Sequence, residues 1–218
     1  MSEAARRAAR HVIWDFDGTL VDTYPAITAQ VVAALRELGV EEDARHVREL
    51  LNASMAETLA FLSSRHRLDP RAVQDAYHAT YDEAGHAASP AFPGARPVLE
   101  AVRARGGLNL VVTHRSRASV LSLLDSTGLL PLMDDMLSVQ EGFVRKPSPE
   151  MFEHVMARHA LMAPEVVVVG DRLLDVRAGR AAGCLTVLFG STEPGEADRA
   201  APDFAALGSC LRDLASNT

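Results

Sequence analysis

Cysteine is scarce in this chain, and long apolar runs are absent. The two cysteines, Cys184 and Cys210, have no short-spaced partner, which argues against a zinc site and a disulfide framework and favours two reduced thiols. No apolar run reaches membrane-spanning length. The arginines near the N-terminus are not followed by the apolar stretch of a secretory signal. These absences predict a soluble, cytoplasmic protein with no membrane partner.

Lysine is rarer still. Of the 22 Lys and Arg residues, all except Lys146 are arginine, as a coding bias toward arginine would produce. An ammonium group on a flexible stem is not interchangeable with a guanidinium, so this one lysine is a candidate functional residue. The formal net charge of −7 argues against a nucleic-acid partner, because a polyanion needs a basic face. The negative net charge does not exclude a small anionic substrate, because a few positive groups near the site can bind it.

The composition suits a globular protein. Hydrophobic residues make up 48% and charged residues 23% of the 218 residues, enough for one core with a smaller companion domain. An apolar run at residues 11–16, followed by Gly18 and Thr19, predicts a buried strand and a turn. Helical periodicity follows. Helices are expected near residues 27–38, near residues 45–51, after a Ser54–Glu57 capping box, and from Asp69 and Pro70 towards Gly85.

Beyond Pro90, Pro93 and Gly94, strand-like and helix-like segments alternate. The expected strands are residues 108–113, 136–139, 166–170 and 185–189. The expected helices are residues 95–105, 117–127, 149–159 and 175–182. Such alternation predicts an α/β fold with a doubly wound, mainly parallel sheet covered by helices on both faces. The core would comprise residues 1–20 and 92–218, interrupted by a helical insert at residues 21–91.

Polar residues follow the first two strands of this predicted core. In the run Asp15-Phe16-Asp17-Gly18-Thr19, two carboxylates one residue apart can divide nucleophilic attack and proton transfer between them. An acidic β-turn is the alternative. Thr113 ends the next strand, where a hydroxyl near a helix N-terminus can bind phosphate. Taken alone, Thr113 is more simply a structural residue, and His114 and Arg115 are more simply exposed polar side chains.

A lysine and two more aspartates lie at later strand-to-helix connections. Lys146 comes just before a helix that Ser148 and Pro149 are expected to start. Asp171 and Asp175 are four residues apart, directly after the apolar strand at residues 166–170. Two carboxylates at such a turn suit a hard, oxygen-seeking cation such as Mg²⁺. Asp175 alone could instead be an ordinary helix N-cap.

These four elements, in this order and each after a strand, resemble the motifs of the haloacid dehalogenase superfamily. The resemblance covers essentially the whole chain. The residues that carry it are, in motif order, Asp15–Thr19, Thr113, Lys146, and Asp171 with Asp175. Residues 146–152 and 170–183 look like the subfamily of phosphoglycolate phosphatase and β-phosphoglucomutase, and the insert looks like its four-helix cap. His114 departs from the pattern, because many relatives have asparagine there.

The resemblance implies a Mg²⁺-dependent phosphatase that hydrolyses a small phosphate monoester. Asp15 would attack phosphorus and become phosphorylated, while Asp17 would protonate the leaving oxygen and then activate water. Thr113 and Lys146 would hold the transferring oxygens. The insert would close over the site and exclude bulk water.

The resemblance also implies a metal site. Asp15, Asp171 and the backbone carbonyl of Asp17 would bind Mg²⁺, and Asp175 would orient Lys146 or a water at the metal.

Several other activities are weighed on the same residues. A dehalogenase needs neither Mg²⁺ nor a second aspartate, so the presence of Asp17 and Asp171 argues against that activity. A phosphonate hydrolase needs a lysine in its cap, and residues 21–91 contain none. A β-phosphoglucomutase has an acidic residue in the place of Gly170 and cap lysines that are missing here. Phosphoryl transfer of that kind and a non-catalytic binding protein on the same fold stay open as alternatives. The physiological substrate, the oligomeric state, the extent of cap opening and closing, and the role of His114 are not predicted.

Overall fold

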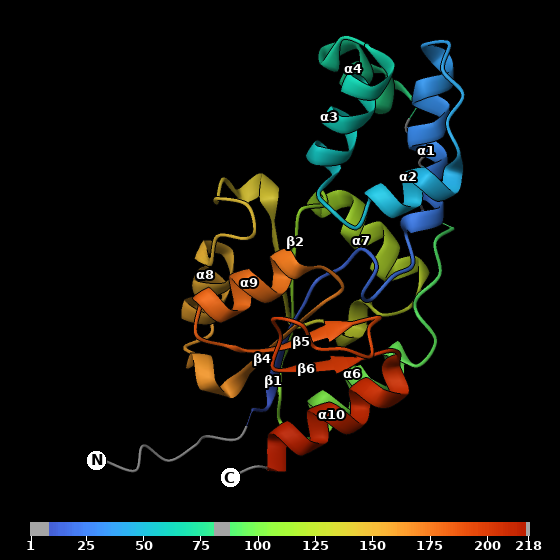
Figure 1. Cartoon of the computed structure of the whole chain (residues 1–218). Helices are drawn as coiled ribbons and strands as arrows, with labels where there is room; N and C mark the ends of the chain where they lie inside the picture. The colour runs from blue at the N-terminus through green and yellow to red at the C-terminus, as the bar shows by residue number, and fades with distance from the viewer. Residues whose placement is uncertain (1–8, 81–87, 217–218) are drawn as a thin grey trace. The chain divides into compact units, whose positions relative to one another are not determined.

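The chain folds into two compact units. The computed structural model describes residues 9–80 and 88–216. The chain passes from the first unit to the second between Val21 and Asp22, and returns between Ser89 and Pro90. The first unit contains the sheet, and the described part of the second is helical (Figure 1).

Within the described residues, six parallel strands form one sheet in the order β3-β2-β1-β4-β5-β6. The strands are β1 (His11–Trp14), β2 (Asn109–Thr113), β3 (Asp135–Ser138), β4 (Val166–Gly170), β5 (Leu185–Phe189) and β6 (Arg199–Ala201). The first strand therefore lies at the centre, with Trp14 opposite Val111 on β2 and Val169 on β4. Because parallel strands end at the same edge, the residues after these three central strands meet there.

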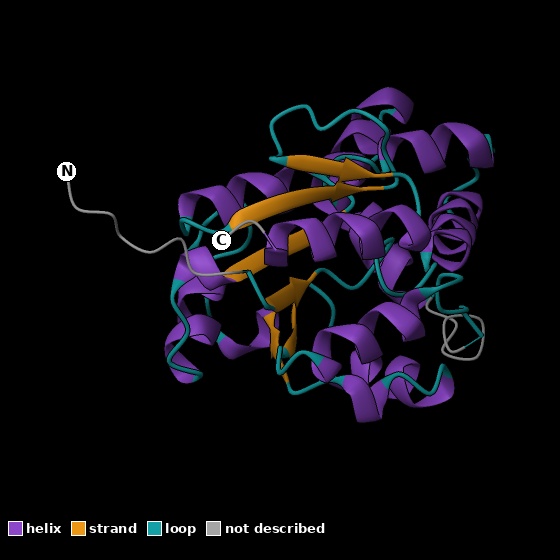
Figure 2. Cartoon of the chain, turned by 90° about the horizontal axis from the view of Figure 1, so that it is seen from below, coloured by secondary structure: helices purple, strands orange, loops and turns teal. Residues whose placement is uncertain are grey.

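Helices cover both faces of this sheet, as Figure 2 shows. One face packs against α6 (Ala95–Ala104), α7 (Arg117–Ser126) and α10 (Phe204–Ser216). The other packs against α8 (Glu150–Arg158) and α9 (Leu173–Ala181). Neighbouring residues of β1 alternate between the two cores: Trp14 stacks on Phe204 of α10 at 6.2 Å, whereas Ile13 packs in the cluster of Phe152. Burial of each such side chain stabilises the folded state by about 1.5–3 kcal/mol. A parallel sheet with helices on both faces confirms the predicted doubly wound α/β architecture.

The second unit has a core of its own. Its helices are α1 (Tyr24–Glu37), α2 (Ala44–Leu50), α3 (Met55–His66) and α4 (Pro70–Ala79). They enclose Val31, Leu35, Val47 and Leu62, all fully buried. Among the described residues, no helix combines the length and the apolar character that crossing a bilayer requires.

The predicted helix starts in this unit are confirmed. Ser54 and Glu57 form the expected capping box of α3, and the Asp69 side chain accepts a hydrogen bond from the Arg71 amide at the start of α4. The predicted extension of α4 towards Gly85 enters residues 81–87, which lie outside the described residues.

The two ends of the helical segment are fastened within the first unit. Val21 forms an antiparallel bridge with Ala91, and the Phe92 amide donates to the carbonyl of Leu20 at 3.0 Å. At the start of this connection Gly18 has φ +76°, a left-handed conformation that favours glycine, and its amide donates to the Val21 carbonyl at 2.9 Å. These contacts thus hold together the turn that follows β1 and the point at which the chain leaves the first unit.

The structure differs from the sequence-based expectation in three elements. Neither β6 nor α10 is among the expected elements. β6 is only three residues long and partly exposed, so it lacks the apolar run of a buried strand. The buried residues of α10, Phe204, Leu207, Leu211 and Leu214, do have the helical spacing that could have predicted it. α9 begins at Leu173 rather than at Asp175, with Arg172 as its N-cap residue. Asp175 therefore is not the N-cap, and its buried side chain in the first turn is available for another role.

Candidate active site

The predicted site residues come together at the carboxyl edge of the three central strands. Asp15 directly follows β1, Thr113 ends β2, and Asp171 directly follows β4. Asp175 lies in the first turn of α9, and Lys146 lies in the loop between β3 and α8. Segments far apart in the sequence thus supply one site because the sheet places their strands side by side.

Lys146 is a buried positive charge held between two aspartates. Its Nζ donates to Oδ1 of Asp15 and to Oδ1 of Asp175, each at 2.6 Å, and its side chain is fully buried. Burial by itself lowers the pKa of Lys146, but the carboxylates of Asp15 and Asp175 outweigh it, so the pKa is raised and the ammonium stays charged. The lysine therefore has a fixed position beside Asp15.

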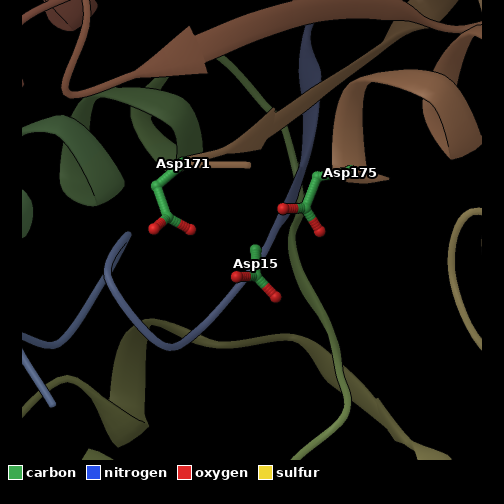
Figure 3. Close-up of side chains that lie close together, drawn as sticks. All are labelled: Asp15, Asp171 and Asp175. Atoms are coloured by element: carbon green, nitrogen blue, oxygen red, sulfur yellow. The ribbon is translucent and has the colours of Figure 1, made fainter. Parts of the chain in front are cut away.

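Three carboxylates gather next to this lysine. One oxygen from each of Asp15, Asp171 and Asp175 lies within 4.8 Å of the others (Figure 3). Oδ2 of Asp15 and Oδ2 of Asp175 are buried and receive no hydrogen bond from the described residues. Burial, followed by the charge of Asp175, raises the pKa of Asp15.

Buried carboxylate oxygens without donors are costly. A hard divalent cation has the oxygen preference and the charge to satisfy them. The residues present therefore fit a metal ion.

Gly170 makes room for Asp175. A Cβ at position 170 would lie 2.6 Å from Cγ and 2.7 Å from Oδ2 of Asp175, closer than real Cβ contacts. Asp175 fills the space that a side chain on the last residue of β4 would need, and from there it reaches Lys146. An acidic residue at position 170 is therefore incompatible with Asp175 in its present place.

The carboxylate of Asp17 lies outside this acidic cluster and pairs with Arg115. Oδ1 of Asp17 accepts from Nε of Arg115 at 2.8 Å and lies 2.7 Å from its Nη2. The Arg115 side chain is only 9% exposed, and its Nη1 donates to Oγ of Ser119 on α7 at 2.9 Å. The prediction of an exposed Arg115 is wrong: this arginine is a partly buried partner of Asp17. The metal role predicted for Asp17 concerns its backbone carbonyl and stays a prediction.

Thr113 and His114 organise the end of β2. The buried hydroxyl of Thr113 accepts from the Arg115 amide at 3.1 Å, and Nε2 of His114 accepts from the Lys146 amide at 3.0 Å. Burial, followed by the charge of Lys146, lowers the pKa of His114 to about 3, so the ring is neutral and carries its proton on Nδ1. His114 is partly buried, not exposed as predicted, and it anchors the backbone of Lys146.

Sequence reasoning passed over Arg172 altogether. Its guanidinium faces the acidic cluster, with Nη2 at 3.7 Å from Oδ2 of Asp15. Arg115 and Arg172 share a signal that could have identified them: each lies within two residues of the carboxyl end of a central strand, where ligands of such sheets bind. The chemistry available at this edge is a carboxylate nucleophile, a second carboxylate for proton transfer, fixed cations for anionic oxygens, and a place for a metal.

The chain is similar to known hydrolases. The family model described as haloacid dehalogenase-like hydrolase matches residues 12–189. A phosphoglycolate phosphatase of Nitrosospira multiformis is 31% identical over 179 residues, which cover 79% of each chain.

Solved structures share the fold. A predicted phosphoglycolate phosphatase of Haemophilus somnus superposes with a TM-score of 0.80 at 21% identity, covering 95% of this chain and 99% of that one. A HAD family hydrolase of Deinococcus radiodurans, whose crystal structure contains phosphate and sodium, superposes with a TM-score of 0.76 at 23% identity. It covers 96% of this chain and 98% of its own.

Proposed function

This chain belongs to the haloacid dehalogenase-like hydrolase family, and we propose that it is a Mg²⁺-dependent phosphatase acting through a phosphorylated Asp15. Its family and the phosphatases among its relatives make it a hydrolase of small phosphate esters. The metal, the intermediate and the substrate are the proposed part. The observation that carries them is the buried Lys146, bonded to Asp15 and Asp175 beside three converging carboxylates.

In the first step Asp15 attacks phosphorus. A carboxylate oxygen of Asp15 forms a bond to phosphorus as the bond to the leaving oxygen breaks, and Asp17 gives its proton to that oxygen. Lys146 and the hydroxyl of Thr113 donate to the transferring oxygens, whose charge they stabilise. Arg115 fixes the position of the Asp17 carboxylate through its two contacts to Oδ1.

In the second step water attacks the phosphorus of the acyl phosphate. Asp17, now ionised, accepts a proton from that water, and the bond between phosphorus and Asp15 breaks, which restores the carboxylate. His114 keeps the Lys146 backbone in place, and Asp175 keeps its ammonium directed at Asp15 through both steps.

The acidic cluster is where Mg²⁺ would be held, by Asp15 and Asp171, with the backbone carbonyl of Asp17 as a further ligand. When bound, the ion supplies positive charge that offsets repulsion between these carboxylates and a phosphate. Asp175 is the fourth metal-site residue of the proposal, acting through its hydrogen bond to Lys146 or through a water at the metal.

Phosphoglycolate is the first substrate to test, because the relative from Nitrosospira multiformis carries the name phosphoglycolate phosphatase. β-Phosphoglucomutase-like transfer is the alternative. It is disfavoured here because the acidic residue characteristic of it would stand at Gly170, where Asp175 occupies the space.

Removing divalent metal should reduce hydrolysis of phosphoglycolate and of 4-nitrophenyl phosphate at least about a hundredfold, since the charge that a metal supplies is worth several kcal/mol in the transition state. The measurement is steady-state hydrolysis after dialysis against a chelator, followed by stepwise addition of Mg²⁺. Activity should return with Mg²⁺ and saturate. Undiminished activity in excess chelator would refute the metal dependence, and no hydrolysis of any phosphate ester with Mg²⁺ would refute the phosphatase.

Arg115→Gln should slow alkyl phosphates about 10- to 100-fold and 4-nitrophenyl phosphate much less, because only a poor leaving group needs a well-placed proton donor. Asp17→Asn should show the same selectivity in stronger form. The measurement is kcat for a series of esters that differ in the pKa of the leaving alcohol.

Arg117→Gln is the matched control. Arg117 begins α7 two residues further on, and its side chain is 51% exposed and bonds to the Met136 carbonyl instead. This variant should leave both substrate types unchanged. If Arg115→Gln slowed both types equally, Arg115 would not act through Asp17.

A further inference from the structure

Arg172 places a second cation against the acidic cluster. Its Nη2 lies 3.7 Å from Oδ2 of Asp15, and its Nε lies 3.9 Å from Oδ1 of Asp171 and 4.0 Å from Oδ2 of Asp175. The side chain is 14% exposed, so water screens these interactions only in part. The phosphoryl-transfer steps described above assign Arg172 no task.

Two of the oxygens that Arg172 faces, Oδ2 of Asp15 and Oδ2 of Asp175, are the buried carboxylate oxygens that receive no hydrogen bond from the described residues. The two Oδ1 atoms that Lys146 binds, on Asp15 and Asp175, are not among them. At 3.7–4.0 Å the guanidinium is within ion-pair range of the Oδ2 atoms but beyond normal hydrogen-bond length. Arg172 therefore neutralises this side of the cluster without fully satisfying its oxygens.

The charges suggest a competition. With all groups ionised, three carboxylates face two cations, Lys146 and Arg172, and the group has a net charge of −1. Without Arg172 the same group would carry −2. A more negative cluster attracts a divalent ion more strongly and is less stable without one, because like charges repel at these distances.

We propose that Arg172 is an internal competitor of the metal ion: its guanidinium holds the three carboxylates together in the metal-free protein and lowers their affinity for Mg²⁺. The inference rests on the proposed metal site. Its consequence is that Arg172 raises the Mg²⁺ concentration at which the site fills.

Calorimetric titration of the metal-free protein with Mg²⁺ alone tests this without any turnover. Arg172→Gln should bind Mg²⁺ about tenfold more tightly than the wild type, which corresponds to about 1.4 kcal/mol. Arg172→Lys keeps the charge and should stay between the two. Arg177→Gln is the control: it removes one positive charge from the same helix, at an exposed position paired with Glu196, and should change the affinity less than twofold.

Thermal unfolding supplies a second readout. Without metal, the Arg172→Gln variant should have a lower melting temperature than the wild type. Added Mg²⁺ should raise the melting temperature of the variant by more than that of the wild type. If Arg172→Gln does not fold without metal, Arg172→Lys carries the same comparison, with a weaker effect in the same direction.

The outcomes separate this inference from the proposed function. Unchanged or weaker Mg²⁺ binding by Arg172→Gln, beside normal binding by the wild type, overturns the competition and leaves the metal site intact. Weaker binding of inorganic phosphate with unchanged Mg²⁺ affinity would likewise overturn it, since Arg172 would then be a substrate ligand. Absence of Mg²⁺ binding by the wild type and by Arg172→Gln would instead refute the metal site itself.

Discussion

Asp15→Asn should reduce hydrolysis of every phosphate ester by about 10⁴-fold, because an amide in place of the nucleophile leaves only binding and charge stabilisation. The variant should also form no phosphoenzyme. The measurement combines steady-state rates with acid quenching of a reaction on radiolabelled substrate. An acyl phosphate on the wild type would be released by hydroxylamine.

Asp69→Asn is the control, because it makes the same chemical change at a residue that the proposed mechanism does not use. Asp69 is the exposed N-cap of α4, where asparagine caps as well as aspartate. The activity of the Asp69→Asn variant should equal that of the wild type. A labelled phosphoenzyme in Asp15→Asn, or a loss of less than about tenfold, would assign the nucleophile to another residue.

Gly170→Ala should lower the free energy of unfolding by about 2–4 kcal/mol, beyond an ordinary overpacking cost, because its methyl group would overlap the buried side chain of Asp175. The central strand β4 has neighbours on both sides and cannot move away. Asp175 would be displaced from Lys146, and activity should fall about 10³-fold as the ammonium loses its support. Denaturant unfolding and steady-state kinetics measure the two effects.

A double-mutant cycle identifies the cause. In an Asp175→Gly background, Gly170→Ala should change stability by less than about 0.5 kcal/mol, since the atoms it meets are gone. Gly208→Ala, on α10 with its nearest neighbour at 3.3 Å, should be close to neutral as a control. An equal loss of stability from Gly170→Ala in both backgrounds would place the conflict elsewhere in the strand.

The sequence was most informative where a buried strand ends in polar residues. Asp15, Thr113 and Asp171 each end or follow an apolar run, and because parallel strands point the same way their carboxyl ends meet at one edge of the sheet. The same logic predicted the α/β sheet, because helices and strands alternate along the core. Lys146 was found for a different reason, as the only lysine in an arginine-rich chain.

The sequence could not predict the contacts of Arg115 and Arg172, because these depend on which segments of the chain meet in the fold. Arg115 is partly buried beside Asp17, which the turn after β1 brings to it. Arg172, the N-cap residue of α9, faces the acidic cluster. Their positions just after the ends of two central strands are the one signal that a single sequence offers for these arginines, and it does not show which side chains they meet. The closing of the helical unit over the site and the cytoplasmic location stay predictions.

The bridge between Val21 and Ala91, with the Leu20–Phe92 hydrogen bond beside it, has a consequence for how such a protein changes over evolution. The entropy lost on closing a loop rises only with the logarithm of its length, by about 0.6 kcal/mol for each doubling. With both ends fastened on the sheet unit, residues 22–89 could lengthen, shorten or be replaced at small cost to the sheet. One inserted segment can therefore replace another during evolution, while the bridge between Val21 and Ala91 and the residues at the ends of the strands stay unchanged.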